Sequence, residues 1–165
     1  MTRSNPTPAR GIATTFAGVR FRSRLEARWA VTFTLLGWSY EYEPMVKTAI
    51  PYLPDFWLES LEVYCEIKPW RIGSHYQKPE WPELRSKIQA ADLDAPVILL
   101  GATYGYSHTG EQADFLAYGF PGYGWYPGKF PITKTPRTRT HPGHPSPREA
   151  WTEAGNKTRW RPRAA

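Results

Sequence analysis

Residues 61–68 read Leu61-Glu-Val-Tyr-Cys-Glu-Ile-Lys68, and this stretch decides the fold class. Apolar side chains alternate along it with polar or aromatic ones, which is the period-two pattern of a β-strand with one core face and one polar face. Residues 50–58 form a second segment rich in aromatic and apolar side chains, and Glu59-Ser60 between the two segments indicates a tight turn. The two segments therefore predict an antiparallel β-hairpin.

The segments around this hairpin predict a layered α/β fold. Residues 22–36 carry apolar side chains at helical spacing, with Ser23 as the predicted N-cap and Gly37 as the stop signal. The other predicted elements are a strand at 38–43, a helix at 82–91 and an entirely apolar strand at 97–100. The order helix, three strands, helix, strand predicts a mixed central sheet flanked by helices, with the last strand in a central position.

Charge divides the chain into two parts. Residues 1–125 hold 12 basic and 13 acidic side chains, whereas residues 126–165 hold 9 basic and 2 acidic ones and are rich in proline. We therefore expect one domain at 10–125, followed by a basic C-terminal tail at 126–165 that is partly disordered. Two interpretations of the tail stay open: a basic arm that lies along a phosphate backbone, or a solvated extension that aids solubility.

Composition excludes several classes of protein. Hydrophobic residues make up 41% of the chain and aromatic residues 15%, which is enough for a packed core and excludes a wholly disordered chain. No apolar run is long enough to span a membrane, and the first residues lack the apolar segment of a secretory signal. The single cysteine, Cys65, excludes an internal disulfide framework. We expect a cytoplasmic protein, in a bacterium or in a phage-infected host cell.

Two carboxylates and one lysine on the predicted hairpin form the strongest candidate for chemistry. Asp55 lies on one strand, and Glu66 and Lys68 lie on one face of the next because they are two residues apart. If Asp55 projects to that face, the two carboxylates repel each other unless a cation lies between them. Oxygen ligands alone suit Mg²⁺ or Mn²⁺, which can assist phosphodiester hydrolysis.

This pattern resembles a known family. Pro54-Asp55, followed by Glu66-Ile67-Lys68, is similar to the signature of the PD-(D/E)XK nuclease superfamily, the restriction-endonuclease-like fold of many restriction enzymes, phage resolvases and recombination exonucleases. Upstream, Phe21-Arg-Ser-Arg-Leu-Glu26-Ala-Arg-Trp-Ala30 resembles the first helix of small phage-type members, in which a helix Glu joins the metal site. The predicted order of elements agrees with the core of that family. The resemblance covers residues 20–101.

The resemblance implies a site and its roles. Asp55 and Glu66 would be ligands of Mg²⁺ or Mn²⁺ together with the carbonyl of Ile67, and Lys68 would be the catalytic lysine. Glu26 would be an additional ligand or would hold a water molecule. A second interpretation of Glu26 stays open, because Ser23 and Glu26 also fit a capping box in which Glu26 bonds back to the Ser23 amide.

The predicted partner is DNA. Basic side chains near Glu26 and in the tail are candidate phosphate contacts, with solvation of a helix face as the alternative: Arg20, Arg22, Arg24, Arg28, Arg137 and Arg139. A homodimer is left open, because many relatives of this fold act as dimers. The sequence thus predicts a metal-dependent endonuclease of phage or prophage origin, structure-selective or nicking. The alternatives are a catalytically inactive DNA- or protein-binding module and a phage anti-defence protein that acts by contact.

Overall fold

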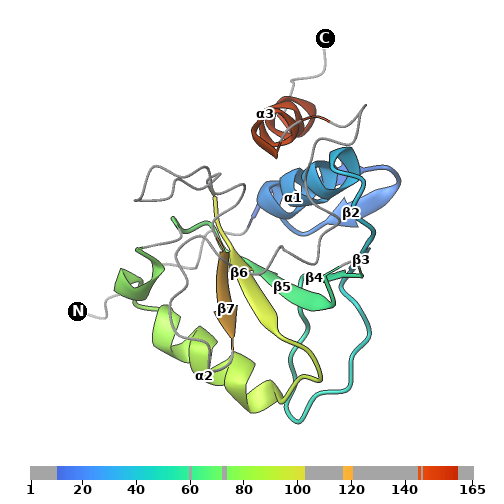
Figure 1. Cartoon of the computed structure of the whole chain (residues 1–165). Coiled ribbons are helices and arrows are strands. Elements are labelled where there is room, and N and C mark those ends of the chain that lie inside the picture. Colours follow the sequence, from blue (N-terminus) through green and yellow to red (C-terminus); the bar gives the residue numbers. More distant parts are fainter. Residues whose placement is uncertain are drawn as a thin grey trace, which may run out of the picture.

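A mixed α/β architecture is seen in the computed structural model, which describes residues 11–59, 61–71, 74–102, 117–120, 145 and 147–159 (Figure 1). No helix within these ranges is long and apolar enough to cross a membrane. The elements in chain order are β1 (Thr14–Phe16), β2 (Val19–Phe21), α1 (Arg24–Leu35), β3 (Tyr40–Tyr42), β4 (Phe56–Leu58), β5 (Val63–Ile67), the 3-10 helix η1 (His75–Gln77), α2 (Trp81–Ala91), β6 (Val97–Leu100), β7 (Ala117–Phe120) and α3 (Pro147–Lys157).

The main sheet has five strands in the order β3-β4-β5-β6-β7. Every neighbouring pair is antiparallel except β5 and β6, which run parallel, so the prediction of a mixed sheet is confirmed. The predicted hairpin is confirmed as β4 and β5, with Phe56 opposite Cys65. Its first strand is much shorter than predicted, because Pro51 and Pro54 lack the amide hydrogens that a continuous ladder needs.

The other predicted elements agree with the structure to within two residues at each end. The first helix begins after Ser23, whose side chain accepts the Glu26 amide as an N-cap. The predicted strand 38–43 is limited to Tyr40–Tyr42, and Glu43 after it has a positive φ of 50°. The predicted helix 82–91 and strand 97–100 correspond to α2 and β6, and β6 lies inside the sheet as expected.

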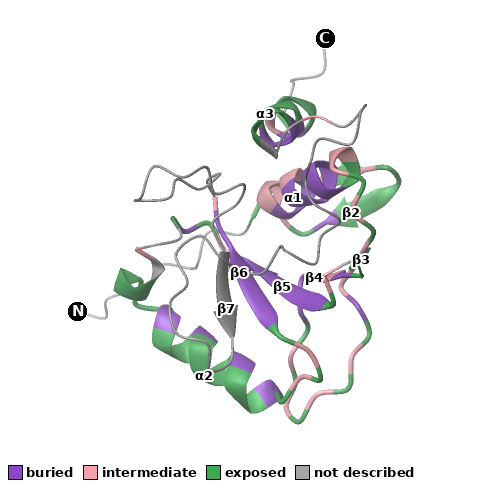
Figure 2. Ribbon diagram, viewed as in Figure 1, coloured by how far each residue is buried: buried purple, intermediate pink, exposed green. Residues whose placement is uncertain are grey.

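Helices cover both faces of the sheet as predicted, but they also cover the side of β5 that was predicted to be polar. Cys65 and Ile98 face the core beneath α1, whereas Tyr64 and Leu99 pack with the apolar side of α2. All five residues of β5 are consequently buried, so the predicted polar face of residues 61–68 is wrong (Figure 2). A period-two pattern shows that two faces differ, but it does not show that a distant helix covers the more polar one.

The helix α3 lies within the segment predicted as a tail. It packs on α1, where the rings of Trp29 and Trp151 are 4.6 Å apart and the Arg28 guanidinium lies 3.8 Å from the Trp151 ring centre. Gly155 allows this close packing, since a Cβ there would come within 2.9 Å of the Arg28 guanidinium. Residues 147–157 therefore belong to the folded body, although the sequence analysis predicted no element there.

Candidate active site

The hairpin of β4 and β5 positions the two predicted carboxylates side by side. Phe56 pairs with Cys65, and Asp55 and Glu66 are the next residues beyond this pair on the two chains. The Asp55 amide donates to the Cys65 carbonyl at 3.0 Å, which holds Asp55 against β5. Both side chains line one cleft, and the charge of Glu66 acts on the Asp55 carboxyl. Both residues are deeply buried, with Asp55 5% exposed and Glu66 6% exposed.

The beginning of α1 brings Glu26 to the same region. One carboxylate oxygen of Glu26 accepts the Ser23 hydroxyl at 2.7 Å. The other accepts the Tyr42 hydroxyl at 2.6 Å and the Arg22 amide at 3.2 Å. The predicted capping box is thus present in altered form, because Glu26 bonds to the Arg22 amide instead of the Ser23 amide. Capping and a place in the site are compatible, since Glu26 also lines the cleft described next.

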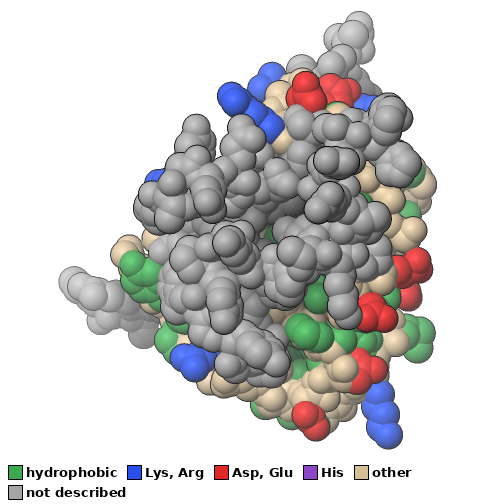
Figure 3. All heavy atoms as spheres, viewed as in Figure 1, with side chains coloured by type: hydrophobic (Ala, Val, Ile, Leu, Met, Phe, Trp, Pro, Cys, Tyr) green, Lys and Arg blue, Asp and Glu red, His purple; other side chains and the backbone are tan. Residues whose placement is uncertain are grey.

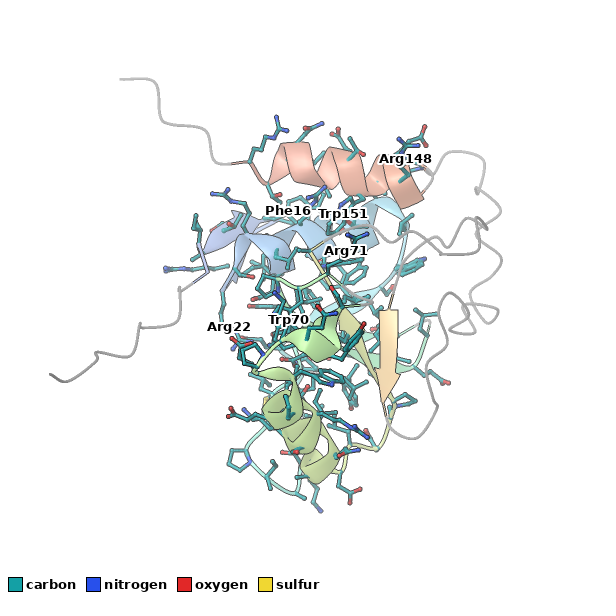
Figure 4. All side chains as sticks on the ribbon, turned by 90° about the vertical axis from the view of Figure 1, so that its left-hand side faces the viewer. Phe16, Arg22, Trp70, Arg71, Arg148 and Trp151 are labelled. Atoms are coloured by element: carbon teal, nitrogen blue, oxygen red, sulfur yellow. The ribbon has the colours of Figure 1, made fainter. Side chains whose placement is uncertain are left out.

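A cleft of about 590 Å³ connects these side chains. It lies between the start of α1, the hairpin and the first turns of α2, and Figure 4 views the molecule from the side where Arg22 and Trp70 lie. Five carboxylates and three cationic side chains line it, for a formal charge of −2. The lining residues are Gly11, Arg22, Ser23, Glu26, Tyr52, Leu53, Asp55, Glu66, Ile67, Lys68, Trp70, Glu80, Glu83, Leu84 and Lys87.

The surroundings of Asp55 disfavour the ionised form of its carboxyl group. Burial and the neighbouring charge of Glu66 raise its pKa to about 7, although the Ile67 amide and Lys68 act in the opposite direction. Oδ2 accepts the Ile67 amide at 2.6 Å, and Oδ1 accepts the Arg22 guanidinium at 2.8 Å. Ionised Asp55 is therefore costly in this cleft unless cationic charge is close to it.

Glu66 is held from two sides. Its Oε1 forms an ion pair with Lys68 Nζ, and its Oε2 accepts the Tyr52 hydroxyl at 2.7 Å. Burial and the charge of Glu66 raise the pKa of Tyr52, so this hydroxyl stays protonated and acts as a donor. The Lys68 side chain remains 29% exposed. One end of the Glu66–Lys68 pair thus lies in the protein interior and the other faces the cleft.

The carboxylates of the cleft are the type of ligand that a hard divalent cation prefers, although they do not form a complete coordination site. Asp55, Glu66 and Glu26 offer only oxygen donors, which is the set that Mg²⁺ and Mn²⁺ prefer. Among the described residues, no group of three or more His, Cys, Asp or Glu side chains is close enough to hold a metal ion. Arg22 and Lys68 instead provide the positive charge at Asp55 and Glu66. Binding of a cation therefore requires at least one of these two side chains to move.

The predicted phosphate-binding arginines separate into four groups. Arg22 lines the cleft, whereas Arg20 on β2 and Arg24 at the start of α1 are outside its lining. Arg28 donates to the Trp151 carbonyl at 3.0 and 3.2 Å and lies on the Trp151 ring, so its contacts are those of a packing residue. The last two, Arg137 and Arg139, lie outside the described residues.

Sequence reasoning did not identify several residues of the cleft. Tyr52 and Tyr42 each hold one glutamate of the site through a hydroxyl, and neither lies in a recognisable motif. The first turns of α2 add Glu80, Glu83 and Lys87. Acidic residues near a helix N-terminus usually stabilise the helix dipole, so nothing in the local sequence separates that role from a place in the cleft.

The hydrogen bond from Tyr52 gives a first prediction. Tyr52→Phe removes the hydroxyl that orients Glu66, and second-sphere losses of this kind typically weaken a metal site by about 10-fold to 100-fold. We expect Mn²⁺ affinity, measured by isothermal titration calorimetry, to fall within that range. Tyr64→Phe is the matched control, because it also removes a tyrosine-to-carboxylate bond, to Asp94 at 2.9 Å, outside the cleft. Equal effects of the two variants would contradict an orienting role for Tyr52.

Comparisons of the chain with protein-family models, with curated proteins and with solved structures found no significant match.

Proposed function

We propose that this protein is a divalent-metal-dependent nuclease that hydrolyses DNA phosphodiester bonds. One observation carries the proposal: Asp55 and Glu66 line the same cleft of formal charge −2, with Lys68 paired to Glu66 beside them. A negatively charged cleft repels a phosphodiester unless cations neutralise it, so the charge itself favours a bound divalent cation. Without such a role, two buried carboxylates would only destabilise the fold, because each loses its hydration on burial.

The order of elements supports the same proposal. The segment from α1 to β6 follows the order helix, three strands, helix, strand, with η1 inserted before α2. This order agrees with the core of the PD-(D/E)XK nucleases that the motif resembles. Under this proposal the mixed α/β fold is a restriction-endonuclease-like core. It is extended by the β1–β2 hairpin, by β7 and by α3.

Each side chain then has a chemical role. A bound Mg²⁺ or Mn²⁺ would supply a Lewis acid that polarises the phosphodiester and acidifies a water molecule. Asp55 and Glu66 would hold this ion with the Ile67 carbonyl, and Glu26 would bind a further water or the ion. Lys68 Nζ, 29% exposed beside Glu66, orients the attacking water and offsets the negative charge that develops on the phosphorus oxygens.

We infer that the substrate enters from the side of the cleft that holds Arg22. On the different face drawn in Figure 3, Lys and Arg side chains of the described residues lie at the upper end and at the lower edge, with acidic side chains near them. Neither view shows a second folded module among the described residues that could read sequence. A structure-selective or nicking endonuclease, such as a phage would encode, fits this small body best.

Plasmid cleavage tests the proposal directly. Full-length protein is incubated with a supercoiled plasmid and a single-stranded circle, in Mg²⁺, Mn²⁺ or EDTA, beside the Lys68→Ala variant. We expect nicking or degradation that requires the metal and falls at least about 100-fold in Lys68→Ala, because removing one electrostatic contact to the transition state typically costs this much. The preferred substrate then identifies the subtype. Arg85→Ala, which removes a cation from the exposed side of α2, is the matched control and should cleave normally.

A catalytically inactive binding module is the competing function, and one observation favours it. Both carboxylates of the hairpin already have an internal cationic partner, Arg22 for Asp55 and Lys68 for Glu66. If neither DNA is cut although the protein binds DNA, and if Mn²⁺ does not bind, the site is a closed ionic network and the nuclease proposal is wrong. A tight protein partner together with no metal-dependent activity would instead support an anti-defence role.

A further inference from the structure

Arg22 occupies the oxygen of Asp55 that a cation would need. Its Nη2 lies 2.8 Å from Asp55 Oδ1, and its Nε lies 2.7 Å from Glu43 Oε1. The other oxygen of Asp55 already accepts the Ile67 amide, so Oδ1 is the one directed toward the cleft. A divalent ion at Asp55 and the guanidinium therefore compete for the same carboxylate oxygen.

The surroundings of Arg22 allow its two ends to behave differently. The backbone is fixed, because the Arg22 amide donates to Tyr42 Oη at 3.0 Å and to Glu26 at 3.2 Å. The side chain is 57% exposed and can rotate into the cleft mouth. Glu43 is also more accessible than Asp55, with side-chain exposures of 32% and 7%. The guanidinium can thus leave Asp55 and remain bound to Glu43.

We propose that Arg22 is an exchangeable cation that holds Asp55 when the metal is absent and binds a substrate phosphate when the metal is present. This inference rests on the proposed nuclease function. Displaced from Asp55 but still held at Nε by Glu43, the guanidinium directs its remaining N–H groups into the cleft mouth. A planar guanidinium with several donors is well suited to phosphate oxygens. Asp55 therefore has a positive charge beside it in both states: the guanidinium when the metal is absent, and the metal ion when it is present.

The exchange makes two predictions of opposite sign for Arg22→Gln. Without DNA, the variant should bind Mn²⁺ about fivefold to tenfold more tightly, because a competing and repelling positive charge is gone. With DNA, a Lys68→Ala background prevents cleavage, and Arg22→Gln in that background with Mn²⁺ should bind duplex DNA more weakly. The slope of log affinity against log salt should then become shallower by about 0.9, the value for one lost phosphate contact. A residue that only supports the fold would weaken both kinds of binding.

Calorimetry with Mn²⁺ and full-length protein measures the first effect, and fluorescence anisotropy of labelled DNA over a salt series measures the second. Arg85→Gln is the control for the loss of one positive charge and should leave both quantities unchanged. Arg22→Lys cannot contact Glu43 and Asp55 at once, so its Mn²⁺ affinity should lie between those of wild type and Arg22→Gln. If Arg22→Gln does not fold, the shift in Arg22→Lys relative to wild type decides the question.

The outcomes separate this inference from the proposed function. If wild type binds Mn²⁺ and cuts DNA but Arg22→Gln binds Mn²⁺ no more tightly, the exchange is overturned and the nuclease remains. An unchanged salt slope in Arg22→Gln overturns the phosphate role in the same way. If wild type binds no Mn²⁺ and cuts no DNA, both proposals are overturned together.

Discussion

Asp55→Asn is expected to lower metal-dependent DNA cleavage by at least about 100-fold, a change as large as that expected for Lys68→Ala. The substitution keeps the shape of the side chain and an oxygen that can accept the Ile67 amide, but it removes the negative charge that would hold the cation. Loss of a metal ligand removes several kcal/mol of transition-state stabilisation, and each 1.4 kcal/mol is about tenfold in rate. Initial rates of plasmid nicking at saturating Mg²⁺ measure the effect.

Two controls separate lost chemistry from lost structure in Asp55→Asn. Glu41→Gln removes a negative charge from an exposed position on β3 that does not line the cleft, and it should cleave at the wild-type rate. The second control is the stability of Asp55→Asn itself, measured by urea unfolding in EDTA. A variant that keeps its full stability but still cleaves at the wild-type rate would remove Asp55 from the site.

The stability of the metal-free wild-type protein is expected to fall as the pH rises. The pKa of Asp55 is raised from 3.8 to about 7 in the folded protein, by burial and by the charge of Glu66. Below about pH 4 the carboxyl is protonated in both states and has no effect. As pH rises from about 4 to about 7, the unfolded chain loses this proton first, so metal-free wild type loses stability, on the order of a few kcal/mol. Asp55→Asn should show a flatter profile over this interval.

Trp151→Ala is expected to have the largest effect on stability, a loss of about 3–5 kcal/mol in the free energy of unfolding. Trp151 is buried, packs on Trp29 at 4.6 Å and lies beneath the Arg28 guanidinium. Truncation removes the ring contacts of Trp151 with Trp29 and Arg28, leaves a cavity and exposes the partner ring. For a chain of this size the loss corresponds to a fall in Tm of about 10 °C, which differential scanning calorimetry measures.

The control for Trp151→Ala is Thr152→Ala, an exposed neighbour on the same helix, whose effect should stay within about 0.5 kcal/mol. A loss below about 1 kcal/mol in Trp151→Ala would show that α3 contributes little to the stability of the fold. The predicted domain boundary at 125 would then hold. The contact also affects how the tail can be tested. Deleting residues 126–165 removes α3 together with the tail, so substitution of Arg137 and Arg139 is the cleaner test of phosphate binding there.

Local patterns in the sequence were sufficient for most elements of the fold. The apolar spacing of residues 22–36 and the Ser23 cap predicted α1 to within two residues, because helix periodicity and capping are local properties. The apolar run 97–100 predicted an interior strand, since a strand with no polar residues must be covered on both faces. The spacing from Asp55 to Glu66 placed two carboxylates on one hairpin, and both line the same cleft.

Other features were decided only by tertiary contacts. Period-two alternation predicted a polar face around Glu66, yet α2 covers that face and leaves Glu66 buried, because a helix 15 residues later packs there. The roles of Tyr52 and Tyr42 depend on hydroxyl groups that reach across 14 and 16 residues of chain. The helix α3 has few apolar residues, and its position depends on Trp29 and Arg28, more than a hundred residues earlier.

The sequence by itself therefore determined the elements from α1 to β6, their order and the placing of Asp55 and Glu66 on one hairpin, because periodicity, caps and turns act over short distances along the chain. The tertiary structure alone decided the electrostatics of the cleft. Burial and the charge of Glu66 raise the pKa of Asp55, and Arg22 reaches it from a position 33 residues earlier. Charge interactions depend on distance in space and on exclusion of water, and neither quantity can be obtained from separation along the sequence.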